Sequence, residues 1–313
     1  MKFIKPTRLK KGDTIGVVAP AWAFDVNNFL RGIEKFKMLG FKVKYDKIIF
    51  RKYWSMAGLD KERAEQINKA FADKEIKAIF CAKAGYGSIR ILPYLNRKEI
   101  RNNPKIFIGY SDITILLLYL QKVARMVVFH GPLVCGEIYE GMNRLTLNFL
   151  LKAVTKPNPL GRISFPGLKV FEQGKAKGIL VGGNLSLIVK TLGTPYEIDT
   201  DNKILFLEDI GEDLEAIDGY FQQLKLAGKF KNIKGVVFGR MVNCFDYGGK
   251  KYRLRNLVRD LFSHLEIPIL YGFPSGHFQK EKHKQVNLTL PLGVEVIVDT
   301  NKLSLIIDES AVI

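Results

Sequence analysis

Residues 105–124 read KIFIGYSDITILLLYLQKVA, so that two apolar runs meet at a single Ser-Asp pair. The first run has the length of a buried strand, and the second, over 112–124, has the length of a helix. A strand that passes directly into a helix predicts a βα unit. Capping of the helix by Ser111 or Asp112 is the more common use of such a pair. The alternative is that Ser111 is a nucleophile held up by the turn.

The segments on both sides of this unit repeat the alternation of strand and helix. Buried strands are expected at 13–20, 76–82 and 126–132, with helical spacing at 24–40 and 60–75. Repeated βα units predict an α/β fold whose first half is a mainly parallel, three-layer sheet. Ligands bind such sheets outside the carboxyl ends of the strands. We therefore expect the loops that follow these strands to converge, namely 82–90, 109–112 and 130–136.

A segment rich in proline and glycine divides the chain. Residues 155–167, TKPNPLGRISFPG, hold three prolines and two glycines, a composition typical of a linker. It predicts an N-terminal α/β domain over 1–154, a linker over 155–168 and a C-terminal β/α domain over 169–313. The second half is more mixed, with an amphipathic helix at 213–228 and short alternating strands near its end.

Composition narrows the class of protein. The 313 residues are 47% apolar and 26% charged, as in an ordinary globular protein. No apolar run reaches the ~18 residues of a membrane-spanning helix, and the N-terminus lacks the apolar core of a secretory signal. The net charge of +18 comes from scattered Lys and Arg, which favours a solvated basic surface over a nucleic-acid interface. Three widely spaced cysteines are expected to be reduced core residues, which favours a cytoplasmic protein.

A serine nucleophile needs a base and an acid that orients the base. His277 follows the Gly/Pro turn YGFPSG and is presented from a loop. The other histidines are His130 at the end of a buried strand, His264 near a helix end and His283 in a charged run. His130 is either a site residue or a core histidine, and the remaining two have structural or solvated settings. Glu208 and Asp209 end an apolar strand, where one side chain should point to each face.

The loop KAGYGS, residues 83–88, contains two glycines. It lacks the spacing of a Walker loop or a dinucleotide-binding fingerprint. The chain also lacks the paired His or Cys spacing of a zinc site. No cofactor or metal is therefore expected. The glycines of this loop can instead bring backbone N–H groups near Ser111, where they would form part of an oxyanion hole.

Taken together, these motifs resemble those of the LD-carboxypeptidase family, the murein tetrapeptide carboxypeptidases, which are serine peptidases. The resemblance runs in family order over nearly the whole chain. It is carried by GDTIGVVAPA, LDKERAEQINKAFADKEIKAIFCAKAGYGSIRILPYL, IGYSDITILLLYL, HGP, GGNLSLIVKTLGTP, FLEDIGE, IDGYFQQLKLAG, and GFPSGH with NLTLPLG.

The resemblance implies a triad in which Ser111 is the nucleophile, His277 the general base and Glu208 the residue that orients His277. The implied oxyanion donors are the backbone N–H groups of Asp112 and of the turn at Gly85 and Tyr86. The implied fold pairs an N-terminal parallel α/β domain with a C-terminal swivelling β/α domain. The implied reaction cleaves the L,D bond between meso-diaminopimelate and the terminal D-Ala of a murein tetrapeptide, through an acyl-enzyme, during cytoplasmic cell-wall recycling. Family members are usually homodimers and need no metal.

The chain departs from the family pattern at several positions that concern substrate contacts. Lys83 and Ala84 stand where the family commonly has Arg-Gly, Gly219 where it has Arg, and Phe278 where it has Gly. A related branch, the microcin C immunity peptidases, shares the triad but cleaves an acyl-sulfamoyl adenylate-peptide conjugate. It is the second candidate. The third is a non-catalytic, ligand-binding α/β protein in which Ser111 only caps a helix.

Overall fold

The computed structural model describes residues 2–244, 254–278 and 286–313, so His283 lies outside the described residues. The chain forms two compact units. The first consists of Met1–Asn158 together with the short segments Leu288–Pro291 and Ala311–Ile313. The second consists of Pro159–Asn287 and Leu292–Ser310. The chain passes from one unit to the other after Asn158, and it returns to the first unit twice near its end.

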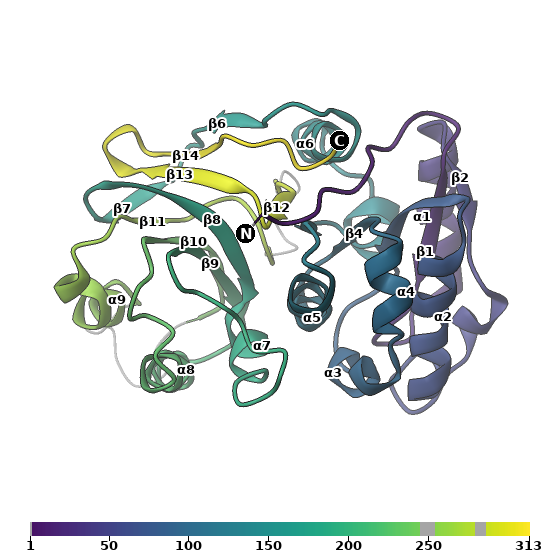
Figure 1. The fold of residues 1–313 in the computed structure, drawn as a ribbon, viewed down its shortest axis with the longest axis horizontal. Helices are drawn as coiled ribbons and strands as arrows, with labels where there is room; N and C mark the ends of the chain where they lie inside the picture. The colour runs from purple at the N-terminus through teal and green to yellow at the C-terminus, as the bar shows by residue number, and fades with distance from the viewer. Residues whose placement is uncertain (1, 245–253, 279–285) are drawn as a thin grey trace. The chain divides into compact units, whose positions relative to one another are not determined.

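The first unit is built on a six-stranded sheet with the order β12-β5-β4-β3-β1-β2 (Figure 1). Its strands are β1 (Thr14–Val18), β2 (Lys42–Lys44), β3 (Ile76–Cys81), β4 (Ile106–Gly109), β5 (Val128–His130) and β12 (Leu290–Leu292). The five strands from the N-terminal half pair in parallel. Parallel strands need crossover connections, which the intervening helices supply. The α/β class and the parallel first sheet are thus confirmed.

Helices of the first unit lie where helical apolar spacing was predicted, over 24–40, 60–75 and 112–124. The α-helices in the described part of this unit are α1 (Val26–Met38), α2 (Asp60–Ala72), α3 (Ser88–Ile91), α4 (Arg97–Asn102), α5 (Thr114–Ala124) and α6 (Arg144–Thr155). Helix α5 is apolar on every side, and all of its residues except Lys122 are buried. It packs beside α4, which in turn packs beside α2 (Figure 1). A helix that is hydrophobic all round belongs in a core, and α5 occupies that position.

The second unit is built on an eight-stranded sheet with the order β6-β14-β13-β8-β9-β10-β11-β7. Its strands are β6 (Gly161–Ile163), β7 (Lys169–Glu172), β8 (Lys175–Asn184), β9 (Lys203–Ile210), β10 (Gly235–Val242), β11 (Ile269–Tyr271), β13 (Glu295–Asp299) and β14 (Ser304–Ile307). Strands β8, β9, β10 and β11 are parallel, and the flanking strands pair antiparallel. The sheet is therefore mixed, as the sequence of the second half of the chain indicates.

The described part of the second unit contains the α-helices α7 (Leu185–Val189), α8 (Leu214–Leu226) and α9 (Leu254–Phe262). Phe221 of α8 and Phe262 of α9 each pack against Phe238 of β10, with ring centroids 6.1 and 6.5 Å from that of Phe238. The two phenylalanines of the helices lie 5.9 Å apart. Burial of these rings fixes both helices on one face of the sheet.

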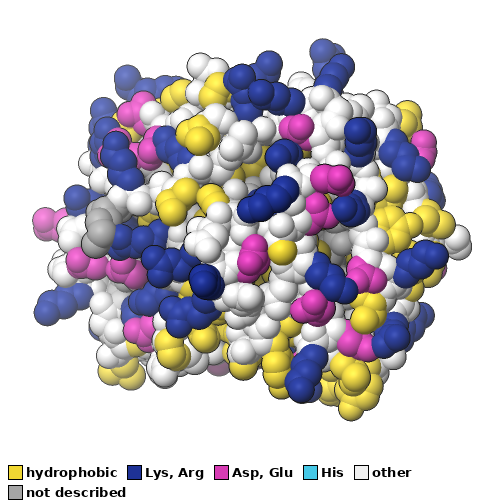
Figure 2. All heavy atoms as spheres, turned by 45° about the vertical axis from the view of Figure 1, so that its right-hand side comes forward, with side chains coloured by type: hydrophobic (Ala, Val, Ile, Leu, Met, Phe, Trp, Pro, Cys, Tyr) yellow, Lys and Arg dark blue, Asp and Glu magenta, His cyan; other side chains and the backbone are white. Residues whose placement is uncertain are grey.

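The surface of the molecule is rich in basic side chains. In Figure 2, Lys and Arg are dispersed, with Asp and Glu among them. Among the described residues, no helix combines the length and apolar character needed to span a membrane. All three cysteines are free; Cys81 is buried, whereas Cys135 and Cys244 are half-buried. The expectation that all three are core residues is therefore wrong for two of them.

Candidate active site

The candidate nucleophile stands on the turn between β4 and α5. Strand β4 ends at Gly109, and Ser111–Ile113 form a single 3₁₀ turn before α5 begins. Ser111 has a φ of 63°, which is the left-handed region that non-glycine residues avoid. A Cβ added to Gly109 would lie 2.6 Å from Cγ2 of Ile113, so only glycine fits there. The strand-to-helix junction is thus a sharp and strained turn, as the nucleophile hypothesis requires.

The capping explanation for this pair is wrong. Neither the 3₁₀ turn nor α5 has a side-chain hydrogen bond at its N-cap. Asp112 is almost completely buried, and its carboxylate accepts a hydrogen bond of 2.9 Å from the backbone N–H of Ser88. Asp112 therefore ties the glycine loop (residues 83–88) to the turn of Ser111 within the first unit.

The three loops that follow β3, β4 and β5 converge as expected. Besides the bond to Asp112, the N–H of Gly131 donates to the carbonyl of Gly109 at 3.2 Å. The N–H of Cys135 donates to the carbonyl of Ala82 at 2.8 Å. These bonds link loops 82–90, 109–112 and 130–136 into one assembly at the carboxyl ends of the parallel strands.

The glycine loop, which is the proposed source of oxyanion donors, has two positions whose backbone conformation favours glycine. Gly85 and Gly87 have φ values of 120° and 122°. A Cβ on Gly85 would lie 2.2 Å from the ring of Trp22, and the ammonium of Lys83 lies 5.8 Å from the Trp22 ring centroid. Tyr86 is exposed. The aromatic ring thus lies directly against the loop.

Arg63 hydrogen-bonds to the backbone of this loop, and no sequence motif identified it as a site residue. Its side chain is completely buried. The guanidinium donates to the carbonyl of Gly87 at 3.0 Å and also to the carbonyl of Pro20. Asp60, three residues earlier on α2, pairs with it. The only sequence signal was this Asp-to-Arg spacing on one helix, which is far commoner as surface pairing.

The candidate base and its orienting acid are in contact within the second unit. The Glu208 side chain, at the end of β9, is fully buried. Its Oε2 accepts the backbone N–H of His277 at 3.0 Å and lies 2.7 Å from Nδ1 of the same residue. A carboxylate only accepts, so Nδ1 carries the hydrogen and Nε2 is left as the basic nitrogen. This tautomer is the one that a general base requires.

Glycine again permits this close approach. Gly276 has a φ of 99°, and a Cβ there would lie 2.5 Å from Oε2 of Glu208. The N–H of Gly276 donates to Oδ1 of Asn287 at 3.1 Å. Asn287 and Glu208 therefore both hold the turn before His277. The backbone N–H and the imidazole of His277 contact the same carboxylate oxygen of Glu208.

Asp209 points away from Glu208, as strand alternation predicts. Its carboxylate accepts the side-chain amide of Asn184 at 2.9 Å and the backbone N–H of Ser186 at 2.8 Å. Burial, and then the neighbouring charge of Glu208, raise the pKa of Asp209 to about 6. Asn184 ends β8 and caps α7 by accepting the N–H of Leu187. Asp209 thus fixes the strand end beside Glu208.

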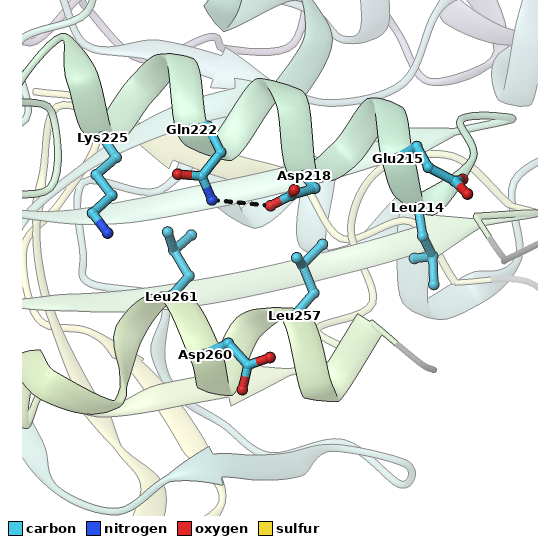
Figure 3. A pocket seen from close by; sticks show the side chains of 8 residues that line it. All are labelled: Leu214, Glu215, Asp218, Gln222, Lys225, Leu257, Asp260 and Leu261. Atoms are coloured by element: carbon cyan, nitrogen blue, oxygen red, sulfur yellow. Dashed lines mark hydrogen bonds between the residues drawn. The ribbon is translucent and has the colours of Figure 1, made fainter. Parts of the chain in front are cut away.

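Two other histidines and one hollow complete the candidate features of the sequence and the described residues. His130 is completely buried, with its ring centroid 5.6 Å from that of Tyr110, and His264 is exposed in a 3₁₀ turn after α9. A hollow of about 420 Å³ lies between α8 and α9, where Gln222 donates to Asp218 at 3.0 Å. Figure 3 shows the side chains that line this hollow. Neither Glu208 nor His277 lines this hollow.

Sequence models of known families match both halves of the chain. Residues 15–131 match the LD-carboxypeptidase N-terminal domain, and residues 177–298 match the LD-carboxypeptidase C-terminal domain. The chain belongs to the LD-carboxypeptidase family. Within this family, it is 35% identical to the Probable murein peptide carboxypeptidase of Bacillus subtilis (strain 168), over 97% of this chain and 94% of the relative.

Solved structures of the family agree with the fold. A muramoyltetrapeptide carboxypeptidase from Oxalobacter formigenes superposes with a TM-score of 0.81 at 28% identity, covering 95% of this chain and 99% of that chain. A microcin C7 self-immunity protein in complex with glutamyl sulfamoyl guanosine gives 0.89 at 27% identity, covering 99% of both chains. Proteins with two different named roles thus share this fold.

Proposed function

We propose that this LD-carboxypeptidase is a serine peptidase whose triad is Ser111, His277 and Glu208. The observation that carries the proposal is the pairing of His277 with Glu208. A completely buried carboxylate accepts both the backbone N–H and Nδ1 of one histidine, which selects the basic tautomer. The strained turn that presents Ser111 is independent support. Ser111 belongs to the first unit, and His277 and Glu208 belong to the second.

The proposed reaction is acyl transfer. Nε2 of His277 takes the proton of the Ser111 hydroxyl as Oγ attacks the scissile carbonyl. The oxyanion is stabilised by the N–H of Asp112 and by the turn at Gly85 and Tyr86. Breakdown of the tetrahedral intermediate expels the amine, which receives the proton from His277. Water, deprotonated by His277, then hydrolyses the acyl-enzyme and restores the serine.

The proposed substrate is a murein tetrapeptide, from which the enzyme releases D-Ala by cleaving the L,D bond after meso-diaminopimelate. The relative from Bacillus subtilis, named for a murein peptide carboxypeptidase, supports this choice. The second candidate is an acyl-sulfamoyl nucleoside conjugate, which the fold similarity to the microcin C7 self-immunity protein supports. We also propose that the enzyme is a homodimer that acts in the cytoplasm on recycled cell-wall peptides.

The test measures D-Ala released from L-Ala-γ-D-Glu-meso-diaminopimelyl-D-Ala, and in parallel the sulfamoyl adenosine released from glutamyl sulfamoyl adenosine. Ser111→Ala should abolish release, with a loss in kcat of about 10⁴–10⁶-fold. Ser55→Ala is the matched control because this serine is exposed in the first unit. Turnover that survives in Ser111→Ala would exclude the nucleophile assignment. Tight peptide binding without turnover by the unmodified protein would instead indicate a non-catalytic binding protein.

A further inference from the structure

Arg63 is a buried cation that joins two loops of the first unit. Its side chain, on α2, is completely buried. Nη1 donates to the carbonyl of Gly87 in the glycine loop at 3.0 Å, and also to the carbonyl of Pro20, which follows β1. The guanidinium therefore bridges the loops after β1 and β3 through two backbone oxygens. A buried charge is costly unless it is paired and hydrogen-bonded, so Arg63 needs the partners around it.

The second glycine of the loop admits the guanidinium. A Cβ added to Gly87 would lie 2.8 Å from Nη1 of Arg63. A side chain at this position would therefore displace the guanidinium from the carbonyl that it binds. The two glycines of the loop thus have separate uses, because Gly85 allows the contact with Trp22 and Gly87 allows the contact with Arg63.

Asp60, three residues earlier on α2, holds the guanidinium in place. Its Oδ1 accepts a hydrogen bond from Nη2 of Arg63. The same carboxylate accepts Nε of Arg90 at 3.0 and 3.1 Å, and Arg90 belongs to α3, which begins at the end of the loop. Burial lowers the pKa of Arg63, and the carboxylates of Asp60 and Asp112 partly offset this shift. One carboxylate thus holds both the cation that binds the loop and the helix that follows the loop.

The candidate oxyanion donors, at 85–86, directly precede the anchored part of the loop. Arg63 binds the carbonyl of Gly87. The next backbone N–H, that of Ser88, donates to Asp112, which follows the candidate nucleophile in the sequence. The backbone that carries the donors is therefore fastened to α2 on one side and to the nucleophile turn on the other.

We propose that Arg63 and Asp60 are positioning residues of the peptidase reaction, which hold the turn at 85–86 so that its N–H groups stabilise the oxyanion. The inference rests on the proposed function. Asp60 orients Arg63, and Arg63 fixes the backbone of the loop, so neither residue touches the substrate. Preorganised donors act on the charge that develops in the transition state. Loss of the anchor should therefore slow the chemical step and leave substrate binding nearly unchanged.

The test measures kcat and KM for D-Ala release from the murein tetrapeptide by Arg63→Lys and Asp60→Asn. The first variant keeps the charge but loses the fork of the guanidinium, and the second removes the charge that orients it. Each should lower kcat by about 10- to 100-fold, because a displaced oxyanion donor loses part of its effect. KM should change by less than about threefold. Glu65→Gln is the matched control, because this acid of α2 is exposed, and it should change neither constant.

Hydrogen exchange of the glycine loop measures the anchoring directly. Exchange of the Ser88 N–H should be faster in both variants than in Glu65→Gln by about 10- to 100-fold, the effect of losing one hydrogen bond to a charged group. A purely structural role would instead destabilise the whole unit and speed exchange throughout its sheet. If Arg63→Lys does not fold, Asp60→Asn still decides the question, because Asp60 is only half-buried.

Three results would overturn the inference: an unchanged kcat in the folded variants, a loss in kcat without faster exchange in the loop, and faster exchange spread over the whole sheet. The proposed function fails in a different way. If the unmodified protein releases no D-Ala, the catalytic role of both residues falls with the reaction, whereas faster exchange confined to the loop would still support their role as its anchor.

Discussion

The strained backbone at Ser111 predicts that glycine is more stabilising there than alanine. Both substitutions remove the hydroxyl and every contact it makes, so their difference isolates the left-handed φ of 63°. A non-glycine residue loses roughly 1–2 kcal/mol in that region. The larger conformational entropy of the unfolded chain lowers the stability of the glycine variant by about 0.4–1 kcal/mol. We expect Ser111→Gly to exceed Ser111→Ala by about 0.5–1 kcal/mol in the free energy of unfolding.

Thermal unfolding followed by tryptophan fluorescence is a suitable assay. The chain has two tryptophans, Trp22 and Trp54, and both belong to the first unit, which carries Ser111. A gain of this size should raise the midpoint for Ser111→Gly by about 1–4 °C over Ser111→Ala. Equal midpoints, or a higher one for alanine, would refute the reasoning, because the turn would then impose no strain. Both variants should be equally inactive, so activity cannot produce the difference.

Two further predictions concern the second unit. Glu208→Gln should lower kcat for D-Ala release by about 10²–10⁴-fold, because the amide neither stabilises the imidazolium nor enforces the tautomer. Glu215→Gln is the control, because this residue is exposed, and it should have no effect. Equal losses in both variants would contradict the role of Glu208. The folded-state pKa of about 6 for Asp209, above its ordinary 3.8, means that between these values the folded state holds a proton that the unfolded state has lost. Raising the pH from about 4 to about 7 should therefore lower the stability of the unmodified protein relative to Asp209→Asn by about 3 kcal/mol. Urea unfolding at both pH values measures this, and a difference independent of pH would show that Asp209 titrates normally.

Local pattern carried much of the prediction. The apolar runs of the first half, the switch to helical spacing after Ser111 and the turn before His277 all lie where the sequence indicates. They are predictable because the period of burial is set by the geometry of a single strand or helix. The convergence of three loops also followed, because parallel strands bring their carboxyl ends to one edge.

Contacts between distant residues were beyond local pattern. Glu208 and His277 are 69 positions apart in the sequence, and their pairing was inferred from family resemblance, not from spacing. The capping interpretation failed because the N-cap positions of the 3₁₀ turn and of α5 are Tyr110 and Ile113, and the Asp112 carboxylate accepts the N–H of Ser88 from another loop. Arg63 looked like a helix-surface residue, yet it is buried under the glycine loop.

By itself, the sequence determined the α/β class, the order of most elements and the residue types able to do acyl transfer, because burial periodicity and side-chain chemistry are properties of short segments. Only the tertiary structure decided which of these residues meet. Strand order sets Glu208 of β9 beside the turn after β11, and a bulge in β10 brings Gly239 close to the side chain of Glu208. Register and bulges arise from the packing of whole sheets, so no single segment encodes them.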